Sequence, residues 1–342
     1  MSMAKWLASV GATVFSLFSV GAHAQFDEQL VKRAQAEGEI VWYTADTPVA
    51  AEGLAAEFKK RFGVTINVSR KLTQTIVQQF KTESSRGSSP ADVITLLGMG
   101  AIPDLAPLLA RYVPKGAAQL PPQYRVQDLG FAYSLSPMGL VYNTRMVSED
   151  DVKLLRSYDG WLNPRFAGKI AMAGPFGGTT GSNMQMIQEK KGIDFIKALV
   201  ETQKAVILQN VGQVGDTVIA GERAIGLNVT PSLVSRAADG APIRFISPDE
   251  WALVVATVAA INAKAPHPNA ARLFLEWVMT PETQKLHDNL AYWVPTLPGV
   301  KPDYPKAEWL TLPKNPIVPE DEVALARRFP ADMERWRAMF RW

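Results

Sequence analysis

The chain has 342 residues, of which 47% are hydrophobic and 20% charged, an ordinary composition for a globular protein. It carries 36 Lys and Arg residues against 33 Asp and Glu, and the basic residues are scattered, so the formal net charge of +3 does not favour nucleic acid or a membrane surface as partner. Cysteine is absent, which excludes disulfides, thiol catalysis and cysteine-based metal sites.

Residues 1–24 are predicted to be a cleavable export signal. Lys5 precedes an uncharged apolar run over residues 6–20, and the small residues Ala22 and Ala24 precede Gln25 as in a secretory cleavage site. The run is shorter than the roughly 20 residues that span a bilayer, so an uncleaved anchor is the weaker alternative. Because the cleavage site has no cysteine, we expect a protein without a lipid anchor that is free in the periplasm.

Strand-like and helix-like segments alternate from Glu39 onward. Strands are predicted over residues 40–43, 64–68 and 92–96. Between them, Pro48 begins a helix with Leu54 and Phe58 on one face, and Thr73 is expected to be the N-cap of the next helix. A short helix over residues 101–109 follows. This β-α-β-α-β order predicts a parallel sheet with right-handed crossovers.

A second α/β series follows two extended segments, 131–134 and 139–142, which are expected to lead from one lobe into another. Strands are predicted over residues 169–172, 206–208 and 225–228, and helices over 180–189, 194–203, 216–220 and 232–238. The apolar segment 251–261 is suited to the return crossing, and helices over 269–279 and 281–290 come after it. Residues 320–342 are predicted to form a helix that is broken near Pro330 and packs its aromatic side chains on a lobe.

These elements predict an α/β protein with two lobes, a hinge and a ligand cleft between them. We expect the first lobe to contain residues 25–135 and 256–300, the second lobe residues 136–255, and a C-terminal helical extension residues 301–342. Ligands in open α/β sheets bind beyond the carboxyl ends of the strands. In this arrangement those ends would face each other across the cleft, and hinge closure would enclose the ligand.

The sequence resembles the bacterial extracellular solute-binding proteins of the ferric-iron, thiamine and phosphonate-binding group. The resemblance runs from about Glu39 to about Pro295 and rests on segments 39–44, 90–93, 134–144, 166–171, 221–226 and 268–282. It implies a type II periplasmic-binding-protein fold and a monomer that delivers a small ligand to an ABC transporter permease in the inner membrane. Iron-binding members of the group place two adjacent tyrosines just after the strand that matches residues 225–228. This chain has Val229-Thr230-Pro231-Ser232 there, which argues against the usual Fe³⁺ site.

Three strand-to-helix turns of the first lobe supply candidate ligand contacts. Thr44 and Asp46 follow the first strand, although Asp46 or Thr47 could instead simply cap the helix at Pro48. Arg70 follows the second strand, close to Thr73, and a guanidinium beside a helix start is a good anion site. Lys71 is expected to be a solvated neighbour. Gly98 follows the third strand and permits a close backbone approach.

On the second lobe the candidates are the uncharged turn before the helix at residue 180, and the end of the strand 225–228. These residues are Gly178, Thr179, Thr180, Gly181, Ser182, Asn228 and Thr230. Free N–H groups at a positive helix end suit phosphate, phosphonate or carboxylate, whereas a flexible surface loop is the alternative. Gln213 is a weaker candidate, and Trp251 is expected to belong to the core.

The sequence does not predict an enzyme, a cofactor or a metal site. His267 and His287 are interpreted as solvated surface residues, and neither accompanies a nucleophile elbow or a metal-ligand spacing. The favoured ligand is a small anion, namely a phosphorylated, phosphonate or carboxylate compound. Fe³⁺ held by other ligands, thiamine facing Asp46, an exported enzyme on the same scaffold and a sensor subunit remain alternatives.

Overall fold

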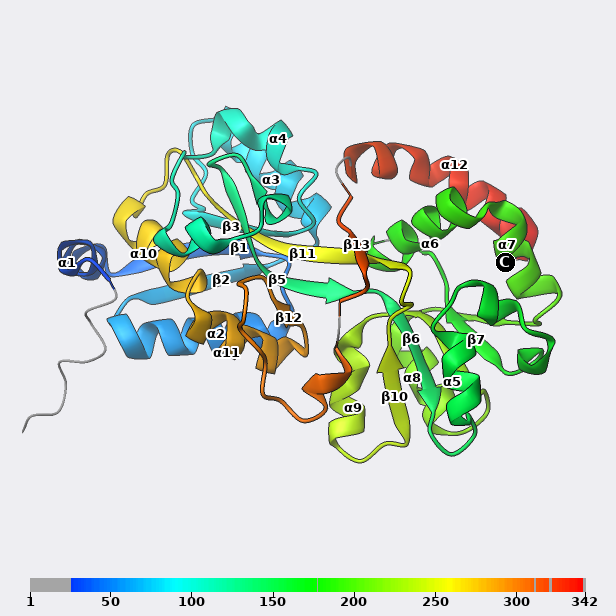
Figure 1. Ribbon diagram of the computed structural model, residues 1–342. Helices are drawn as coiled ribbons and strands as arrows, with labels where there is room; N and C mark the ends of the chain where they lie inside the picture. Colours follow the sequence, from blue (N-terminus) through cyan, green and yellow to red (C-terminus); the bar gives the residue numbers. More distant parts are fainter. Residues whose placement is uncertain (1–25, 177, 311, 320–321, 341–342) are drawn as a thin grey trace, which may run out of the picture.

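The protein is a two-lobed α/β molecule, as predicted, and each lobe is built on its own sheet (Figure 1). The computed structural model describes residues 26–176, 178–310, 312–319 and 322–340. The predicted export signal and Trp342 lie outside these residues. Within the described ranges, no helix is both long enough and apolar enough to cross a bilayer.

The first lobe contains a sheet with the strand order β12-β5-β11-β3-β1-β2. Its strands, with two short ones paired to β5 and β11, are β1 (Glu39–Thr44), β2 (Thr65–Arg70), β3 (Val93–Leu97), β4 (Arg125–Val126), β5 (Gly130–Pro137), β11 (Trp251–Ile261), β12 (Val294–Pro295) and β13 (Asn315–Ile317). Its helices are α1 (Glu28–Glu37), α2 (Pro48–Phe62), α3 (Thr73–Ser85), α4 (Ile102–Leu105), α10 (Pro268–Val278) and α11 (Pro281–Ala291). β1 pairs in parallel with β2 and β3, which confirms the predicted parallel core.

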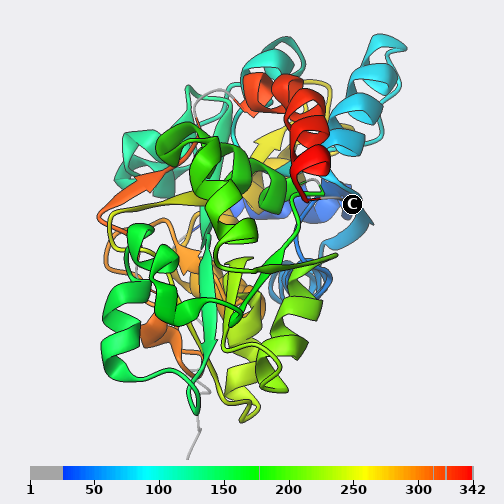
Figure 2. The same ribbon diagram turned by 90° about the vertical axis from the view of Figure 1, so that its right-hand side faces the viewer.

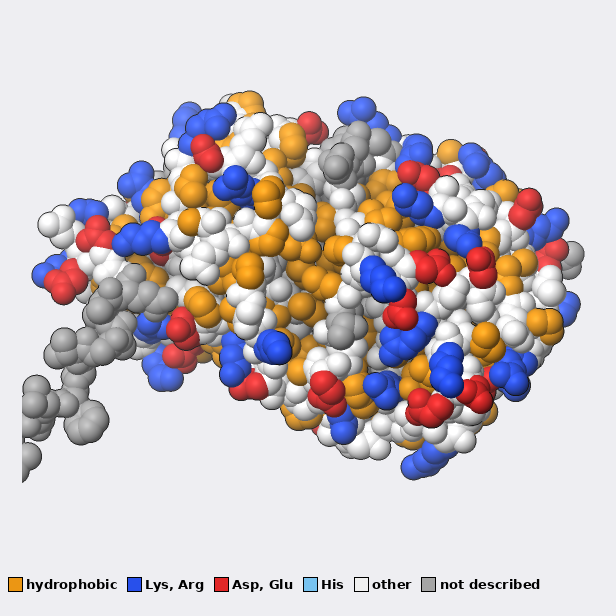
Figure 3. All heavy atoms as spheres, viewed as in Figure 1, with side chains coloured by type: hydrophobic (Ala, Val, Ile, Leu, Met, Phe, Trp, Pro, Cys, Tyr) orange, Lys and Arg blue, Asp and Glu red, His pale blue; other side chains and the backbone are white. Residues whose placement is uncertain are grey.

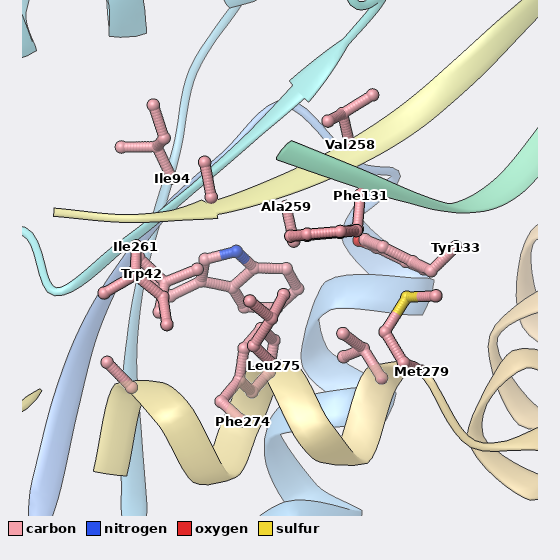
Figure 4. Close-up of a cluster of buried hydrophobic side chains, with 14 of the residues drawn as sticks. Trp42, Ile94, Phe131, Tyr133, Val258, Ala259, Ile261, Phe274, Leu275 and Met279 are labelled. Atoms are coloured by element: carbon pink, nitrogen blue, oxygen red, sulfur yellow. The ribbon is translucent and has the colours of Figure 1, made fainter. Parts of the chain in front are cut away.

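Aromatic side chains from three elements form the centre of the first lobe. Trp42 of β1, Phe58 of α2 and Phe274 of α10 are fully buried, and the ring centroids of Trp42 and Phe274 are 5.1 Å apart. Figure 4 shows Phe274 and Leu275 on the α10 side of Trp42. Burying one such side chain contributes about 1.5–3 kcal/mol, so this cluster holds α2 and α10 on the sheet.

The second lobe contains a five-stranded sheet with the order β10-β6-β9-β7-β8. Its strands are β6 (Gly139–Asn143), β7 (Ile170–Ala173), β8 (Val206–Leu208), β9 (Ile225–Val229) and β10 (Ile243–Ile246). The helices that follow or cover them are α5 (Glu149–Leu155), α6 (Gly178–Lys191), α7 (Ile193–Glu201), α8 (Val211–Ile219), α9 (Val234–Ala238) and α12 (Glu322–Phe340). β7 is parallel to both β8 and β9.

Two long strands carry the chain between the lobes (Figure 1). β5 leads through Pro137 and Met138 into β6, and β11 returns antiparallel to β5. Met138, Leu253 and Val255 form a small buried cluster at this crossing. A Cβ atom on Gly139 would collide with the carbonyl oxygen of Ile246, so glycine is needed where β6 begins beside the end of β10. The predicted crossings are therefore present, while the residue boundaries given for the lobes stay predictions.

The C-terminal helix α12 packs on α6 of the second lobe, and both views show the two helices together (Figures 1 and 2). Trp336 is fully buried, and Phe329 and Met333 join the same cluster. The predicted break near Pro330 is wrong, because the helix continues through that residue. Proline removes one backbone hydrogen bond, but side chains on both sides of Pro330 pack on the lobe and hold the helix together.

Candidate functional site

The turns after β1, β2 and β3 lie side by side at the edge of the first sheet that faces the second lobe (Figure 1). The Lys71 N–H donates to the Thr44 carbonyl at 3.0 Å. The prediction that Thr73 is the N-cap of α3 is wrong. Thr73 is the first residue of that helix, and its hydroxyl accepts the Leu97 N–H at 3.0 Å. Gly98 has a φ of 103° and donates to the Ala256 carbonyl at 2.7 Å, which joins the third turn to β11. The three predicted turns therefore form one surface.

Asp46 is fully buried below this surface. Its Oδ2 accepts hydrogen bonds from Tyr133 Oη at 2.9 Å and from His287 Nε2 at 2.8 Å. Its Oδ1 accepts the Thr47 N–H at 2.7 Å, and its own N–H donates to Thr44 Oγ1 at 3.1 Å. The carboxylate of Asp46 is therefore occupied by protein donors and lies away from solvent.

His287 lies between two carboxylates in the interior of the first lobe. Its Nδ1 is 2.9 Å from Asp288 Oδ1, which also accepts the hydroxyl of Ser134. Burial alone would lower the pKa of His287, but Asp46 and Asp288 outweigh burial and raise the pKa to about 10, so the ring is a cation at neutral pH. The interpretation of His287 as a surface residue is wrong, since its side chain is fully buried. His267 is closer to a surface residue, because its side chain is 24% exposed, although its Nδ1 lies 2.9 Å from Asp92 Oδ2.

A β-bulge in β5 directs two consecutive side chains into this buried cluster. The register opposite β11 shifts so that Ala132 pairs with Val258 and Ser134 with Thr257, which leaves Tyr133 as the extra residue. A bulge of this kind re-aims a side chain that regular alternation would send to the other face. Tyr133 consequently reaches Asp46 while Ser134 reaches Asp288. Burial, followed by the charge of Asp46, raises the pKa of Tyr133 well above its usual value of 10, so the phenol stays a hydrogen-bond donor.

Arg70 is exposed and is attached to the turn that contains Asp46. Its Nε donates to the backbone carbonyl of Asp46 at 2.7 Å, which restrains the guanidinium at one of its three nitrogens. Lys71 is directed elsewhere, because its Nζ donates to Ser69 Oγ at 3.0 Å and lies 4.9 Å from the centre of the Tyr43 ring. The prediction that Lys71 is a solvated neighbour is wrong, because Lys71 is half-buried and has these two partners, whereas Arg70 is the exposed cation of the pair.

On the second lobe the candidate turn forms the start of α6. Gly178 adopts a φ of 56°, Ser182 Oγ donates to the Gly178 carbonyl at 3.3 Å, and Thr179 and Thr180 are half-buried. Gly181 is buried, and a Cβ atom there would overlap the ring of Phe329 from α12. The first turn of α6 therefore presents backbone N–H groups and hydroxyls, and α12 covers its far side.

Asn228 holds this helix start onto the sheet. It has a φ of 59°, and its Nδ2 donates to the carbonyls of Ala173 at 2.8 Å and Thr180 at 3.2 Å. Asn183, which the sequence analysis did not identify, donates to Asn228 Oδ1 at 3.0 Å. Asn228 is itself buried, whereas Thr230 is half-buried and its hydroxyl lies 2.8 Å from Ser232 Oγ. Asn228 thus supports the α6 turn from below.

The remaining candidates have structural partners. Gln213 caps its own helix region through a bond from the Gln209 N–H at 2.9 Å. Trp251 stacks on Tyr158 with ring centroids 4.1 Å apart, in agreement with its predicted core role. Among the described residues, no group of three or more His, Asp or Glu side chains could hold a metal ion.

The comparisons with known proteins agree with this architecture. A family model described as bacterial extracellular solute-binding protein matches residues 53–317. Among solved structures, iron-bound HitA from Pseudomonas aeruginosa is 21% identical with a TM-score of 0.68, and the match covers 85% of this chain and 99% of that chain.

Two further structures are similar to the same extent. The Trichodesmium protein IdiA (FutA), in complex with iron and citrate, is 19% identical with a TM-score of 0.68, over 89% of this chain and 100% of that one. The apo ferric ion-binding protein A of Pasteurella haemolytica is 18% identical with a TM-score of 0.70, over 88% and 98% of the two chains. At these identities the likeness shows a shared two-lobed fold.

Proposed function

Because the chain belongs to the bacterial extracellular solute-binding proteins, we propose that it captures a small anionic solute between its lobes and presents it to the permease of an ABC importer. Its fold is the two-lobed fold of type II periplasmic binding proteins, as the sequence predicted. Capture is a shift of population toward the closed form, in which both lobes contact the ligand. The solute class is a phosphorylated, phosphonate or carboxylate compound.

We choose an anion as the ligand because Arg70 is exposed whereas Asp46 is buried. Arg70 is exposed at the edge facing the second lobe, with its Nε fixed; its two terminal nitrogens have no partner among the described residues and suit a bidentate contact. Asp46, the carboxylate that would have favoured a cationic solute such as thiamine, is fully buried. The uncharged start of α6 would add N–H donors from the other lobe.

Iron is the main competing ligand within the family. The names of the similar structures mention iron for HitA and iron with citrate for IdiA (FutA). Where the resemblance places adjacent tyrosines in iron-binding members, this chain has Val229-Thr230-Pro231-Ser232, and a hard cation prefers charged oxygen donors. A ligand that includes both Fe³⁺ and an anion would still use Arg70, so the ligand screen includes it.

Replacing Arg70 with alanine should weaken binding of the anion about 10- to 100-fold, because hydrogen bonds to a charged group contribute about 1.5–3 kcal/mol. The protein from Gln25 to Trp342 is unfolded and refolded to remove bound solute. It is then screened by thermal shift with phosphate esters, phosphonates, carboxylates, thiamine, and Fe³⁺ with and without carbonate. Ligand at 100 times its Kd should stabilise the protein by about 2.7 kcal/mol.

Lys71→Ala is the matched control, since it removes the neighbouring positive charge but leaves Arg70 and its bond to Asp46 in place. It should change affinity less than about threefold. Equal losses in the two variants would mean that only the general charge of this edge matters. A response to thiamine alone, or turnover of a bound compound, would overturn the proposal.

We also propose that the protein acts in the periplasm as a monomer after removal of residues 1–24. The basic residue, apolar run and small residues before Gln25 support cleavage at that point. N-terminal sequencing of the exported protein should therefore begin at Gln25, and light scattering should give the mass of one chain. An intact Met1 on the exported protein would contradict the cleavage.

A further inference from the structure

We propose that His287 is a positioning residue for the ligand: with Asp46, it fixes the direction in which the Arg70 guanidinium faces the second lobe. This inference rests on the proposed function, because it concerns the same ligand site. Buried residues of the first lobe would then contribute to ligand recognition without contacting the ligand.

A continuous chain of hydrogen bonds connects His287 to Arg70. His287 Nε2 is 2.8 Å from Asp46 Oδ2, and the backbone carbonyl of Asp46 accepts Arg70 Nε at 2.7 Å. Asp46 is held from two other directions, by Tyr133 Oη at 2.9 Å and by the Thr47 N–H at 2.7 Å. The carbonyl that holds Arg70 therefore belongs to a residue whose side chain has little freedom to turn.

His287 supplies the positive charge that the buried carboxylates of Asp46 and Asp288 require. Asp46, His287 and Asp288 are all fully buried, and two carboxylates in the interior need a cation between them. When the His287 ring is protonated, both of its N–H groups donate, one to each carboxylate. A neutral side chain in its place would leave two uncompensated negative charges, one of them on Asp46, whose carbonyl holds Arg70, and the Asp46 turn would shift to relieve them.

Restraining Arg70 in this way favours recognition of an anion. A free arginine side chain loses considerable conformational entropy when it binds, and restraining it beforehand lowers that loss. With Nε held by Asp46, the planar guanidinium keeps its terminal nitrogens in a set direction, which suits a carboxylate or phosphate oxygen pair. The cluster also includes Tyr133 and Ser134 of β5, the strand that leads into the crossing between the lobes.

The inference can be tested on the ligand-free protein by NMR of the arginine Nε–H groups. In the wild type, the Arg70 Nε–H should give a resolved signal that exchanges slowly with water, and Arg70→Lys identifies it. In His287→Gln the signal should exchange at least about tenfold faster or become averaged, because the Asp46 carbonyl is no longer held in place. The Arg33 Nε–H, which donates to Asn269 at 3.1 Å on the far side of the lobe, is the internal reference.

His267→Gln is the matched control variant. It also removes a histidine paired with a buried aspartate of the first lobe, at 2.9 Å from Asp92, but that pair has no link to Arg70. The Arg70 signal should be unchanged in it. A folded His287→Gln protein with the wild-type Arg70 signal would overturn the inference. If His287→Gln does not fold, Tyr133→Phe decides, since it removes a single bond to Asp46 and should accelerate exchange in the same direction.

A second measurement separates this inference from the proposed function. Inorganic phosphate is titrated into the wild type, His287→Gln and His267→Gln, and binding is followed by calorimetry. Positioning predicts a loss of about tenfold in His287→Gln and none in His267→Gln. If no anion of the panel binds to the wild type, the proposed function fails, while the Arg70 signal still decides whether His287 positions that side chain.

Discussion

His287→Leu is expected to lower the free energy of unfolding by about 3–5 kcal/mol, because it removes the cation from a buried group of charges. Asp46 and Asp288 would remain fully buried, each without its imidazole partner. The leucine side chain fills part of the space, so the loss comes mainly from the two uncompensated carboxylates and not from a cavity. Urea unfolding at pH 7, followed by tryptophan fluorescence, measures the difference from the wild type.

His267→Leu provides the comparison for this result. The His267 side chain is 24% exposed, and Asp92 keeps hydrogen bonds from the backbone N–H groups of Val41 and His267 when the ring is removed. A partly exposed pair of this kind contributes about 1 kcal/mol or less. Equal losses in the two variants would show that His287 does not act as a buried cation.

The contribution of His287 should also depend on pH in a defined direction. Its folded-state pKa of about 10 lies above the ordinary value of 6.5, so its stabilising contribution is fully present below about pH 6.5 and is lost as pH rises through about 10. Between pH 7 and 9.5 the wild type should lose unfolding free energy on the order of a few kcal/mol. His287→Leu should lack this part of the decline. A wild-type stability that is flat over the same range would contradict a protonated ring.

The regular elements of this protein could be predicted from the sequence because their signals are local. Continuous apolar runs bounded by polar residues predicted β8 (Val206–Leu208) and β11 (Trp251–Ile261) with the bounds that the structure has. Most of the elements that were missed are short, although α1 (Glu28–Glu37) has ten residues, with Asp27 and Gly38 as its caps. β10 (Ile243–Ile246) is four residues long and contains Arg244, and α5 (Glu149–Leu155) begins with a Ser148–Asp151 capping box that could have been recognised.

The candidate site was harder to predict because its interior is assembled from distant residues. Asp46 and His287 are 241 positions apart, and no periodicity in either segment indicates that they meet. The β-bulge that turns Tyr133 toward them depends on the pairing of β5 with β11. Local chemistry indicated Arg70 as a candidate, but only the packed structure shows that the Asp46 carbonyl accepts a hydrogen bond from its Nε. The helix through Pro330 was mispredicted for a similar reason. Packing of the turns on both sides of Pro330 holds the helix together, and this packing is not visible in the local sequence.

Trp336→Ala is expected to release α12 from the second lobe. Trp336 is fully buried and its indole Nε1 donates to Gln188 Oε1 on α6 at 2.9 Å. Truncating a buried tryptophan costs about 3–5 kcal/mol, and this loss falls on the contact between α12 and the lobe. The loss should be local, because the core of the first lobe does not include α12. Hydrogen exchange should therefore accelerate strongly in α12 and at the neighbouring start of α6, while β1 and α10 keep their protection.

Arg337→Ala serves as the control, because Arg337 is exposed on the same helix and its removal should leave exchange unchanged. The release of α12 has a consequence for the ligand site. Phe329 covers Gly181 in the first turn of α6, and Asp332 accepts hydrogen bonds from Gln185 at 2.8 Å and Gln188 at 3.0 Å. Once these contacts are lost, the start of α6 becomes more mobile, and an anion that uses its N–H groups should bind less tightly. Unchanged exchange in α12 of the Trp336→Ala protein would mean that the remaining contacts hold the helix and that the indole is not its anchor.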